Sequence, residues 1–396
     1  MRIPLSFLIV VIAFSLLVDG YIYLVARRRC VSPIPSRLQL VSALVLYVVL
    51  IVGVSMPRRS GGDASLIAIM WVLFGYMTFL VPKIVFTAMD IIASLPKLWH
   101  SRRWRWLSVA GGVIALAAFL AMWWGALVNR FRIDVNEVDV TFSRLPVSFN
   151  GLRILQISDL HVGTYGEDDS FIRRLVSEIN ALHPDVVMFT GDIVNRHSSE
   201  LIPFMNALSG IDAPYGVYSI LGNHDYGDYS DWPSEEAKSA DLEQLCRMQS
   251  DMGWKLLRNQ TDYLRRGSDS LAIVGVENIG DPPFRIYGSL ESAYPETGDS
   301  VSKILLSHNP AHWTDSIAGR ENVNIGLTLS GHTHAMQIEV GGISPASLRY
   351  PTWGGLYRDK SGSHALYVNI GAGTVGMPMR LGATPEITLL TLKAMP

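Results

Sequence analysis

The second half of the chain places histidine, aspartate and asparagine residues directly after short apolar runs. Runs of this kind have the length of β-strands, so the polar side chains that follow them lie at strand ends. Loops at the ends of neighbouring strands can direct such side chains into one crevice. The residues concerned are Asp159, His161, Asp192, Asn223, His308, His332 and His334. We therefore expect one site built from nitrogen and oxygen donors.

The composition of this donor set indicates metal binding. It contains no thiolate, so it suits Mn, Fe or Zn at a reactive centre better than a structural, sulfur-ligated zinc. Seven donors exceed the needs of one tetrahedral ion, whereas two ions that share a carboxylate would use all of them. Two metal ions about 3.5 to 4 Å apart can hold a bridging hydroxide as nucleophile and bind the oxygens of a phosphoryl group. The set therefore predicts two divalent metal ions and hydrolysis at phosphorus.

The elements that would position these side chains follow from the apolar pattern. Short apolar runs predict strands at residues 152–157, 186–189, 217–221, 271–276, 303–306 and 325–329, behind an alternating stretch at 132–142. Apolar residues at helical spacing predict a helix over residues 170–182. Strands interleaved with helices predict an α/β domain. Residues 225–241 are acidic, aromatic and interrupted by Gly and Pro, so we expect a surface loop there.

The first 130 residues have a different composition. Four apolar stretches, at about residues 3–25, 38–56, 66–92 and 107–128, approach the roughly 20 residues that a helix needs to cross a bilayer. Pro82 and Lys83 interrupt the third stretch, which leaves open a shorter span that continues as an interfacial helix. We predict a membrane domain with four transmembrane helices over residues 1–130, a linker with a leading strand over 131–150, and a catalytic domain over 151–396.

The charges divide in the same way. The chain has 33 Lys and Arg and 35 Asp and Glu; 13 and three of these lie in residues 1–130, which leaves 20 and 32 for residues 131–396. An acidic domain repels phosphate backbones, so we expect no nucleic-acid partner. With 49% hydrophobic and only 17% charged residues, the composition excludes an ordinary soluble enzyme.

Lys and Arg residues in the short loops indicate the orientation of the spans. The loops after the first and third spans carry eight of them, and the opposite side carries five. This bias places those two loops in the cytoplasm, and both termini with the catalytic domain outside it. Asp19, Lys83 and Asp90 lie near the spans. We expect each of these charged residues to lie near a helix end or to pair with a neighbour, rather than to form a transport path.

The motifs of the second half also resemble a known family. In chain order they read D-x-H, G-D, G-N-H-D, a lone H and G-H-x-H. This ordered set resembles the calcineurin-like metallophosphoesterase superfamily over residues 151–396. The tail over residues 371–386, rich in Gly with a following Arg and Pro-Glu, resembles the membrane-associated bacterial YaeI/YkuE-like phosphodiesterase subgroup.

The resemblance implies a fold and a division of the ligands. The fold is a sandwich of two mixed β-sheets flanked by helices. One ion would be bound by Asp159, His161 and His334, the other by Asn223, His308 and His332, with Asp192 as the bridge.

The resemblance also assigns two residues to catalysis. His224 would stabilise charge on the phosphoryl group and protonate the leaving oxygen, and Asp225 would orient its imidazole. The sequence has Ala335-Met336-Gln337 where Gly-Gly-Gln is more common in the subgroup, so it departs at the first two positions. We expect this difference to affect which substrate shapes fit the site more than it affects metal binding.

Together these features predict a membrane-anchored, metal-dependent phosphoesterase. It would hydrolyse a phosphoester or pyrophosphate bond by attack of a metal-bridging hydroxide, with His224 as the acid. Because anchoring keeps the site beside a bilayer, we expect membrane lipids as partners and a phosphorylated, lipid-linked substrate, without an obligate protein partner. Related enzymes that split UDP-diacylglucosamine use a cytoplasmic substrate, which conflicts with the predicted topology. The alternative is a membrane sensor or transporter whose domain binds metal or ligand without turnover.

Overall fold

The chain folds into two units. The computed structural model describes residues 5–57, 59–60, 63–142, 144–282, 284–295, 298–320 and 323–394. One unit comprises Met1–Val128 with Gly376–Met379, and the other comprises Asn129–Val375 with Arg380–Pro396. The first unit contains the predicted membrane spans, and the second contains all the predicted donors.

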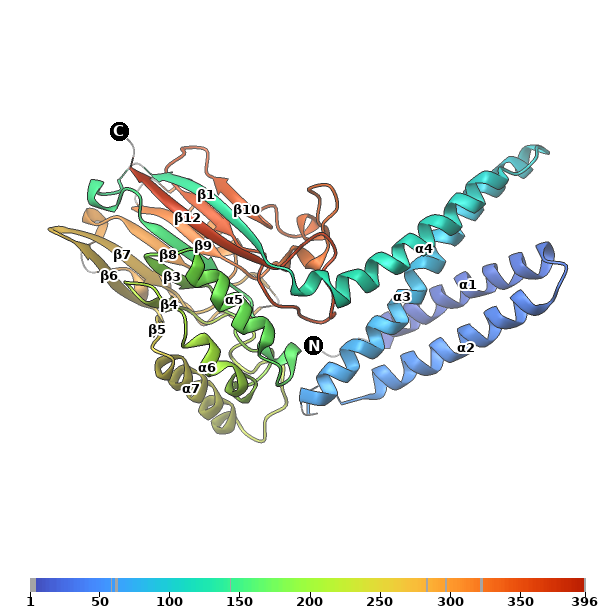
Figure 1. Ribbon diagram of the computed structural model, residues 1–396, viewed down its shortest axis with the longest axis horizontal. Helices are drawn as coiled ribbons and strands as arrows, with labels where there is room; N and C mark the ends of the chain where they lie inside the picture. Colours follow the sequence, from blue (N-terminus) through green and yellow to red (C-terminus); the bar gives the residue numbers. More distant parts are fainter. Residues whose placement is uncertain are drawn as a thin grey trace. The chain divides into compact units, whose positions relative to one another are not determined.

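The described part of the first unit has four helices that are long and apolar enough to cross a bilayer. They are α1 (Leu5–Arg29), α2 (Ile34–Ser55), α3 (Asp63–Ser94) and α4 (Arg105–Leu127) (Figure 1). Each coincides with one predicted stretch, so the prediction of four helices is confirmed. Helix α3 has 32 residues and includes Pro82 without a break, so a shorter span that continues as an interfacial helix stays an open alternative. Membrane helices tolerate proline where neighbouring groups satisfy the freed carbonyl.

Asp19, Lys83 and Asp90, which lie within these helices, each have an oppositely charged partner. The ammonium group of Lys83 lies 2.8 Å from the carboxylate of Asp19. Asp90 contacts the guanidinium groups of Arg29 at 2.6 Å and Arg103 at 3.0 Å. Because a charge in an apolar environment is costly unless it has a partner, these pairs account for the presence of the acids. The interpretation that they pair with neighbours is confirmed.

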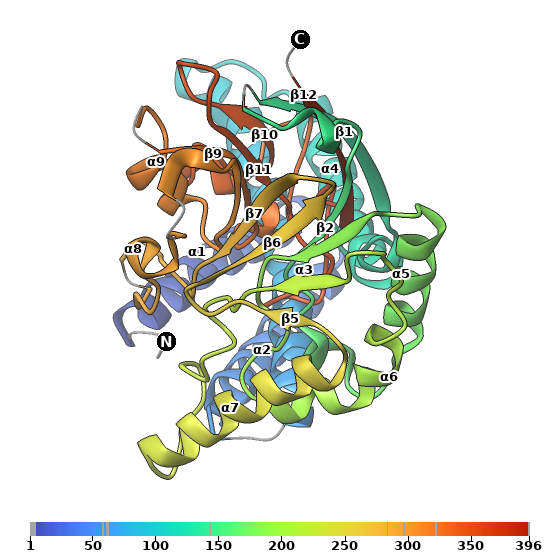
Figure 2. The same ribbon diagram turned by 90° about the vertical axis from the view of Figure 1, so that its left-hand side faces the viewer.

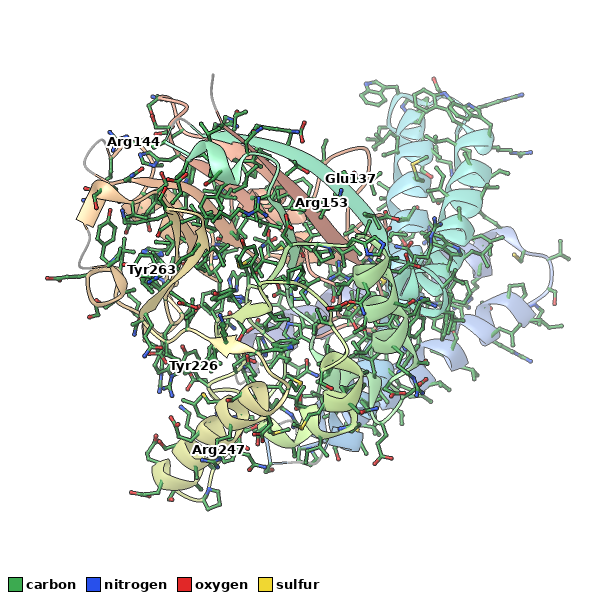
Figure 3. The ribbon with its side chains drawn as sticks, turned by 60° about the vertical axis from the view of Figure 1, so that its left-hand side comes forward. Glu137, Arg144, Arg153, Tyr226, Arg247 and Tyr263 are labelled. Carbon is green, nitrogen blue, oxygen red and sulfur yellow. The ribbon has the colours of Figure 1, made fainter. Side chains whose placement is uncertain are left out.

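The described strands of the second unit form two mixed, six-stranded sheets. The first has the order β1 (Asp134–Phe142), β12 (Glu386–Ala394), β2 (Arg153–Ile157), β3 (Val186–Phe189), β4 (Val217–Ser219), β5 (Lys255–Leu256). The second has the order β10 (Gly355–Arg358), β11 (Ala365–Val368), β9 (Ile325–Ser330), β8 (Lys303–Leu306), β7 (Asp269–Gly275), β6 (Gln260–Arg266). Strands β2, β3 and β4 run parallel, as do β7, β8 and β9. The predicted sandwich of mixed sheets is confirmed; Glu137 on β1 and Arg153 on β2 mark the first sheet in Figure 3.

Apolar side chains hold the two sheets together and attach the helices. Ile154 of β2 shares a buried core with Ile304 of β8 and Leu329 of β9, between the sheets. Alternate residues of the first sheet face the other way and pack against α5 (Ser170–Ala181) and α7 (Glu235–Asp251). Helices therefore flank the sandwich, as Figure 2 shows for α5, α6 (Met205–Leu208) and α7. Helix α5 confirms the helix predicted over residues 170–182.

The prediction of a loop over residues 225–241 is wrong in its second half. Helix α7 begins at Glu235, behind Ser234, whose hydroxyl accepts a hydrogen bond from the N–H of Ala237 at 3.2 Å. Glu235 and Glu236 lie in the first turn, where acidic side chains interact favourably with the helix dipole. The acidic composition that suggested a loop is thus the start of a helix.

Candidate metal centre

The carboxyl ends of parallel strands from both sheets meet at one edge of the sandwich. The side chain of Gln156 on β2 joins the sheets there, since its amide donates to the carbonyl of Ser330, the last residue of β9, at 2.8 Å. The loops that follow β2, β3, β4, β8 and β9 bring together Asp159, His161, Asp192, Asn223, His308, His332 and His334. All seven predicted donors are therefore neighbours at this edge.

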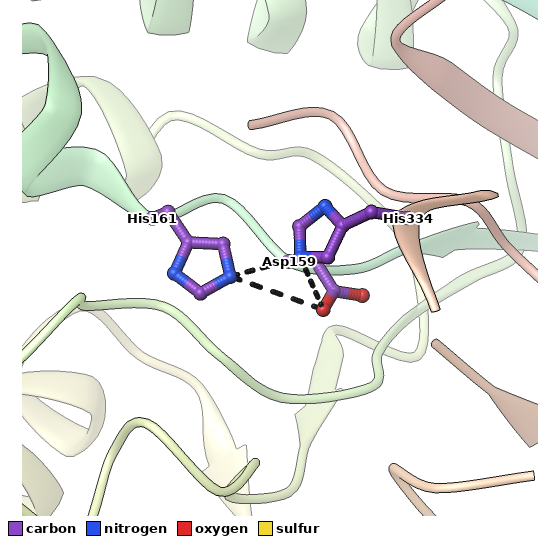
Figure 4. Close-up of side chains that lie close together, drawn as sticks. All are labelled: Asp159, His161 and His334. Atoms are coloured by element: carbon purple, nitrogen blue, oxygen red, sulfur yellow. Dashed lines mark hydrogen bonds and ion pairs between the residues drawn. The ribbon is translucent and has the colours of Figure 1, made fainter. Parts of the chain in front are cut away.

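One group of donors consists of Asp159, His161 and His334, all buried (Figure 4). The Nε2 atoms of the two imidazoles lie 3.0 Å apart. Nε2 of His334 lies 3.2 Å from a carboxylate oxygen of Asp159, and Nε2 of His161 lies 4.0 Å from the same oxygen. Three donors that face one another over such distances can hold one cation.

A second group surrounds His308 and overlaps with the first. Asp159, Asp192 and His308 have potential ligand atoms within 4.8 Å of one another. Nε2 of His308 lies 3.2 Å from Oδ2 of Asp192 and 3.3 Å from Nδ1 of His332. The same Oδ2 atom lies 3.6 Å from Nε2 of His161 in the first group. Asp192 is therefore placed between the two groups, as a bridging carboxylate would be.

Asn223 has a side-chain oxygen at the metal centre that accepts no hydrogen bond from the described residues. Its amide nitrogen donates to the hydroxyl of Tyr229 at 2.9 Å, which fixes the amide orientation. Its Oδ1 atom is buried and has no hydrogen-bond partner among the described residues. A buried carbonyl oxygen without a partner is costly, and a cation would satisfy it. The donor set thus fits metal binding on an observation independent of sequence motifs.

The backbone around the donors is unusual. Five of them adopt positive φ angles between 43° and 73°, a region that residues other than glycine seldom occupy; they are Asp159, His161, Asp192, His332 and His334. Such conformations cluster at functional sites, where the surrounding structure holds them in place. Two glycines allow the backbone to pack closely against the donor carboxylates. A Cβ atom on Gly222 would collide with the carboxylate of Asp192, and one on Gly331 would collide with that of Asp159.

The acids and histidines shift one another's pKa values. Burial would raise the pKa of Asp159 and Asp192, but the adjacent His334 and His308, respectively, hold both below the usual range of aspartate. Burial lowers the pKa of His308, but the charges of Asp192 and Asp159 outweigh it and raise the value to about 9. For His332, burial and the charge of His308 lower the pKa to about 3. His308 thus carries a proton that a cation can replace.

His224 lies at the edge of the metal centre, and one of its ring nitrogens is already hydrogen-bonded. Its Nδ1 atom lies 2.7 Å from the backbone carbonyl of Asn195 and donates to it. Its ring stacks on Tyr229 at 4.1 Å and meets His161 edge to face at 4.8 Å. Burial lowers the pKa of His224. Because Nδ1 is occupied, Nε2 is the atom that can exchange a proton with a substrate.

The prediction that Asp225 orients this imidazole is wrong. The carboxylate of Asp225 accepts hydrogen bonds from the backbone N–H groups of Asp192, Ile193, Val194 and Gly222, at 2.8 to 3.2 Å. Burial and the charge of Asp192 raise its pKa to about 7, while these N–H groups oppose the rise. Asp225 therefore holds the loop that carries Asp192 beside the loop that carries Asn223.

Tyr350 is a neighbour that the motifs did not indicate. Its hydroxyl lies 3.1 Å from Nε2 of His332 and donates to Asp281 at 3.3 Å. If Nε2 of His332 donates to this hydroxyl, Nδ1 is left as the ligand atom that faces His308. A tyrosine 16 residues beyond His334 gives no local signal, and neither does the backbone carbonyl of Asn195, because both act through the tertiary fold.

The donors open into a cavity of about 310 Å³. Its walls include His224, the apolar side chains of Phe284 and Met336, and the cationic side chain of Arg349. Met336 and the preceding Ala335 both have positive φ angles, of 46° and 51°. These are the positions where the subgroup more often has glycine, so the departure expected to affect substrate shape does place a large side chain at the cavity.

Comparison with known families divides the chain as its composition does. Residues 152–336 match the calcineurin-like phosphoesterase family. Residues 1–130 match the transmembrane domain of a probable calcineurin-like phosphoesterase. Among individual proteins, the chain is 31% identical over 274 residues to the uncharacterized metallophosphoesterase YkuE of Bacillus subtilis, which covers 66% of this chain and 86% of that protein.

Two further relatives have names that refer to a membrane or to a lipid-linked substrate. A transmembrane protein with metallophosphoesterase domain from Danio rerio is 33% identical over 288 residues, which span 71% of this chain and 62% of that protein. The UDP-2,3-diacylglucosamine pyrophosphatase LpxG of Chlamydia trachomatis is 27% identical over 326 residues, which span 69% of this chain and 94% of that protein.

Proposed function

The chain belongs to the calcineurin-like phosphoesterase family, and from this we propose that it hydrolyses a phosphoester or pyrophosphate bond of a lipid-linked substrate with two divalent metal ions. It is a membrane protein with a metal-dependent phosphoester hydrolase domain. The observation that carries the two-metal proposal is the position of Asp192, whose Oδ2 atom lies 3.6 Å from His161 and 3.2 Å from His308.

The residues divide into ligands and a proton donor. Asp159, His161 and His334 would hold one ion, and Asn223, His308 and His332 the other, with Asp192 shared. Bound divalent cations lower the pKa of water and polarise phosphoryl oxygens, and the nitrogen and oxygen donors suit Mn, Fe or Zn.

His224 is the proposed acid. With Nδ1 held by the carbonyl of Asn195, Nε2 can give its proton to the leaving oxygen. Burial lowers the pKa of His224. A negatively charged phosphoryl group in the cavity would act in the opposite direction and favour the protonated ring.

The cavity and the membrane region support the proposed substrate class. A cavity of about 310 Å³ is at the small end of ligand sites, so it suits a phosphorylated headgroup rather than a large molecule. Apolar Phe284 and Met336 stand beside cationic Arg349 at its wall, which matches a molecule with both apolar and anionic parts. LpxG, by its name, acts on a lipid-linked pyrophosphate. These features support a lipid-linked substrate over a free nucleotide.

For the side of the membrane, we propose that the catalytic domain is extracytoplasmic. An even number of spans would put the N-terminus and the catalytic domain on the same side, and the eight-to-five bias of Lys and Arg supports the outer side. Fusions of alkaline phosphatase and of green fluorescent protein to the C-terminus test this. We expect an active phosphatase and a dark fluorescent protein; the opposite pair of results would place the domain in the cytoplasm.

Hydrolysis of bis(p-nitrophenyl) phosphate by the full-length protein in detergent tests the activity. We expect turnover with Mn²⁺, none after chelation, and none for Asp192→Asn, which removes the shared charge. Asp139→Asn removes one charge from an exposed position on β1 and serves as the matched control with wild-type turnover. Absence of turnover with Mn, Zn, Fe and Ni would instead favour the non-catalytic sensor or transporter.

A further inference from the structure

The segment between His334 and Tyr350 exposes large aliphatic side chains. Val340, Ile343 and Leu348 are 68%, 71% and 91% exposed. Val340 and Ile343 pair across a two-residue turn of glycines, both at positive φ, so they sit at the tip of a tight hairpin. We call residues 340–348 the apolar tip. Three exposed aliphatic side chains within nine residues of the chain are a candidate contact with a partner or a membrane.

The apolar tip is tied to the point where the chain leaves its last membrane helix. Helix α4 ends at Leu127, and the side chain of Asn129, which is buried, donates to the backbone carbonyl of Arg380 at 3.0 Å. The next residue, Leu381, forms a β-bridge with Ile338, two residues before the tip begins. Backbone hydrogen bonds of 2.8 Å on both sides of Leu381 fix this bridge.

These links restrict where the tip can be. A chain advances at most about 3.6 Å per residue, so Asn129 cannot be far from the end of α4. Neighbouring bridged segments lie about 5 Å apart, so the base of the tip cannot be far from Asn129. The base of the tip therefore lies near Asn129, the residue at which the catalytic unit begins after α4.

The same segment borders the catalytic cavity at both ends. Met336, 48% exposed, precedes the tip, and Arg349 directly follows it; both line the cavity. The guanidinium group of Arg349 is paired with Asp281 and remains partly exposed. An apolar tip next to a cationic group is the pattern of protein surfaces that enter the lipid–water interface, where acyl chains lie below anionic headgroups.

We propose that the apolar tip inserts into the interface of the bilayer that holds the chain, so that the cavity opens toward lipid headgroups. The occupant of this surface is bilayer lipid. The insertion itself is independent of catalysis. Its consequence for substrate rests on the proposed function: the phosphate that is cleaved belongs to a lipid that remains in the membrane, and its acyl chains stay beside Val340, Ile343 and Leu348.

Spin labelling of the full-length protein in phosphatidylcholine nanodiscs tests the insertion. Cys30 and Cys246 are replaced by Ser, and a nitroxide is attached through Ile343→Cys. The matched control is Val147→Cys, at a position that is 81% exposed. This position lies near the C-terminal end of β12, because the side chain of nearby Asn150 accepts a hydrogen bond from the N–H of Ala394. We expect the label at 343 to be relaxed more by oxygen than by a water-soluble nickel chelate, and the label at 147 to show the reverse.

Two results would overturn the insertion. Equal accessibility of both labels to the nickel chelate would show that the tip is in water. A label at 343 that is shielded from both reagents and shows dipolar broadening would show that a second copy of the chain covers the tip.

Turnover measurements distinguish a role of the apolar tip in binding lipid from a role in the hydrolysis itself. The variant Val340→Ser, Ile343→Ser, Leu348→Ser is compared with Val147→Ser on two substrates with the same leaving group, bis(p-nitrophenyl) phosphate and p-nitrophenyl dodecyl phosphate. We expect the triple variant to keep its activity on the first and to lose about tenfold in kcat/KM on the second, because three apolar contacts are removed. Equal changes on both substrates would overturn the lipid role of the tip. Failure of the wild-type protein on both would overturn the proposed function and leave the spin-label result standing.

Discussion

The imidazole of His224 donates from Nδ1 to the backbone carbonyl of Asn195 over 2.7 Å, which leaves Nε2 as the only ring nitrogen available to a substrate. A carbonyl, rather than a carboxylate, therefore sets the tautomer of the proposed acid. This arrangement separates proton donation from metal binding, so the two can be tested independently.

Replacement of His224 by Ala should lower kcat by about 10² to 10⁴-fold, the usual contribution of a positioned proton donor. The bound metal should be unchanged. Steady-state kinetics and elemental analysis of the same sample measure both quantities, with His183→Ala at an exposed position as the control. Loss of metal together with activity would make His224 a ligand instead.

Asp225→Asn should destabilise the protein. Each carboxylate oxygen of Asp225 accepts hydrogen bonds from two backbone N–H groups, and the NH₂ group of an asparagine would face two of these donors without being able to accept from them. A buried donor without an acceptor costs about 1 to 3 kcal/mol. We expect a lower midpoint of thermal unfolding for the metal-free protein, with little change for Asp251→Asn at an exposed position in α7. Wild-type stability with reduced turnover would restore the role in catalysis that the sequence suggested.

Tyr350→Phe should weaken binding of the ion held by His332, since the hydroxyl 3.1 Å from Nε2 fixes the orientation of that ring. Loss of a group that orients a metal ligand typically reduces affinity by about 10 to 100-fold. Competition with a chelating dye measures this directly, and excess metal should restore turnover. Tyr263→Phe on β6 is the control. Unchanged affinity would show that the contact with Tyr350 is only packing.

The sequence predicted seven of the twelve described strands, β1 to β4 and β7 to β9, and the proposed ligands beside them, because both leave local patterns. Apolar runs predicted β3 and β8 at the residues where they occur, and each ligand follows its strand by a few positions. The roles of Asp225 and Tyr350 could not be predicted, because they depend on which loops lie side by side after folding. The start of α7 was missed because acidic residues are common both in loops and in the first turn of a helix.

Binding of metal should release a proton near neutral pH. The pKa of His308 is raised to about 9 in the metal-free protein, above the usual value for histidine, so its ring is protonated at pH 7. A cation must displace that proton from Nε2, the atom facing Asp192. Affinity should therefore rise by up to about tenfold per pH unit toward pH 9 and level off above it.

Calorimetric titration of the metal-free protein in buffers with different ionisation enthalpies measures this release. We expect about one proton per chain at pH 7, and fewer for His308→Gln. Binding without proton release would mean that His308 is not a ligand.

The most direct test of the whole account is the amount of metal in active protein. Full-length protein would be purified without added metal or chelator, assayed on bis(p-nitrophenyl) phosphate, and submitted to elemental analysis. The convergence of seven donors, with Asp192 between the two groups, predicts two transition-metal ions per chain, loss of turnover when they are removed, and recovery when Mn²⁺ is returned. Full turnover in protein with less than one ion per chain would contradict it.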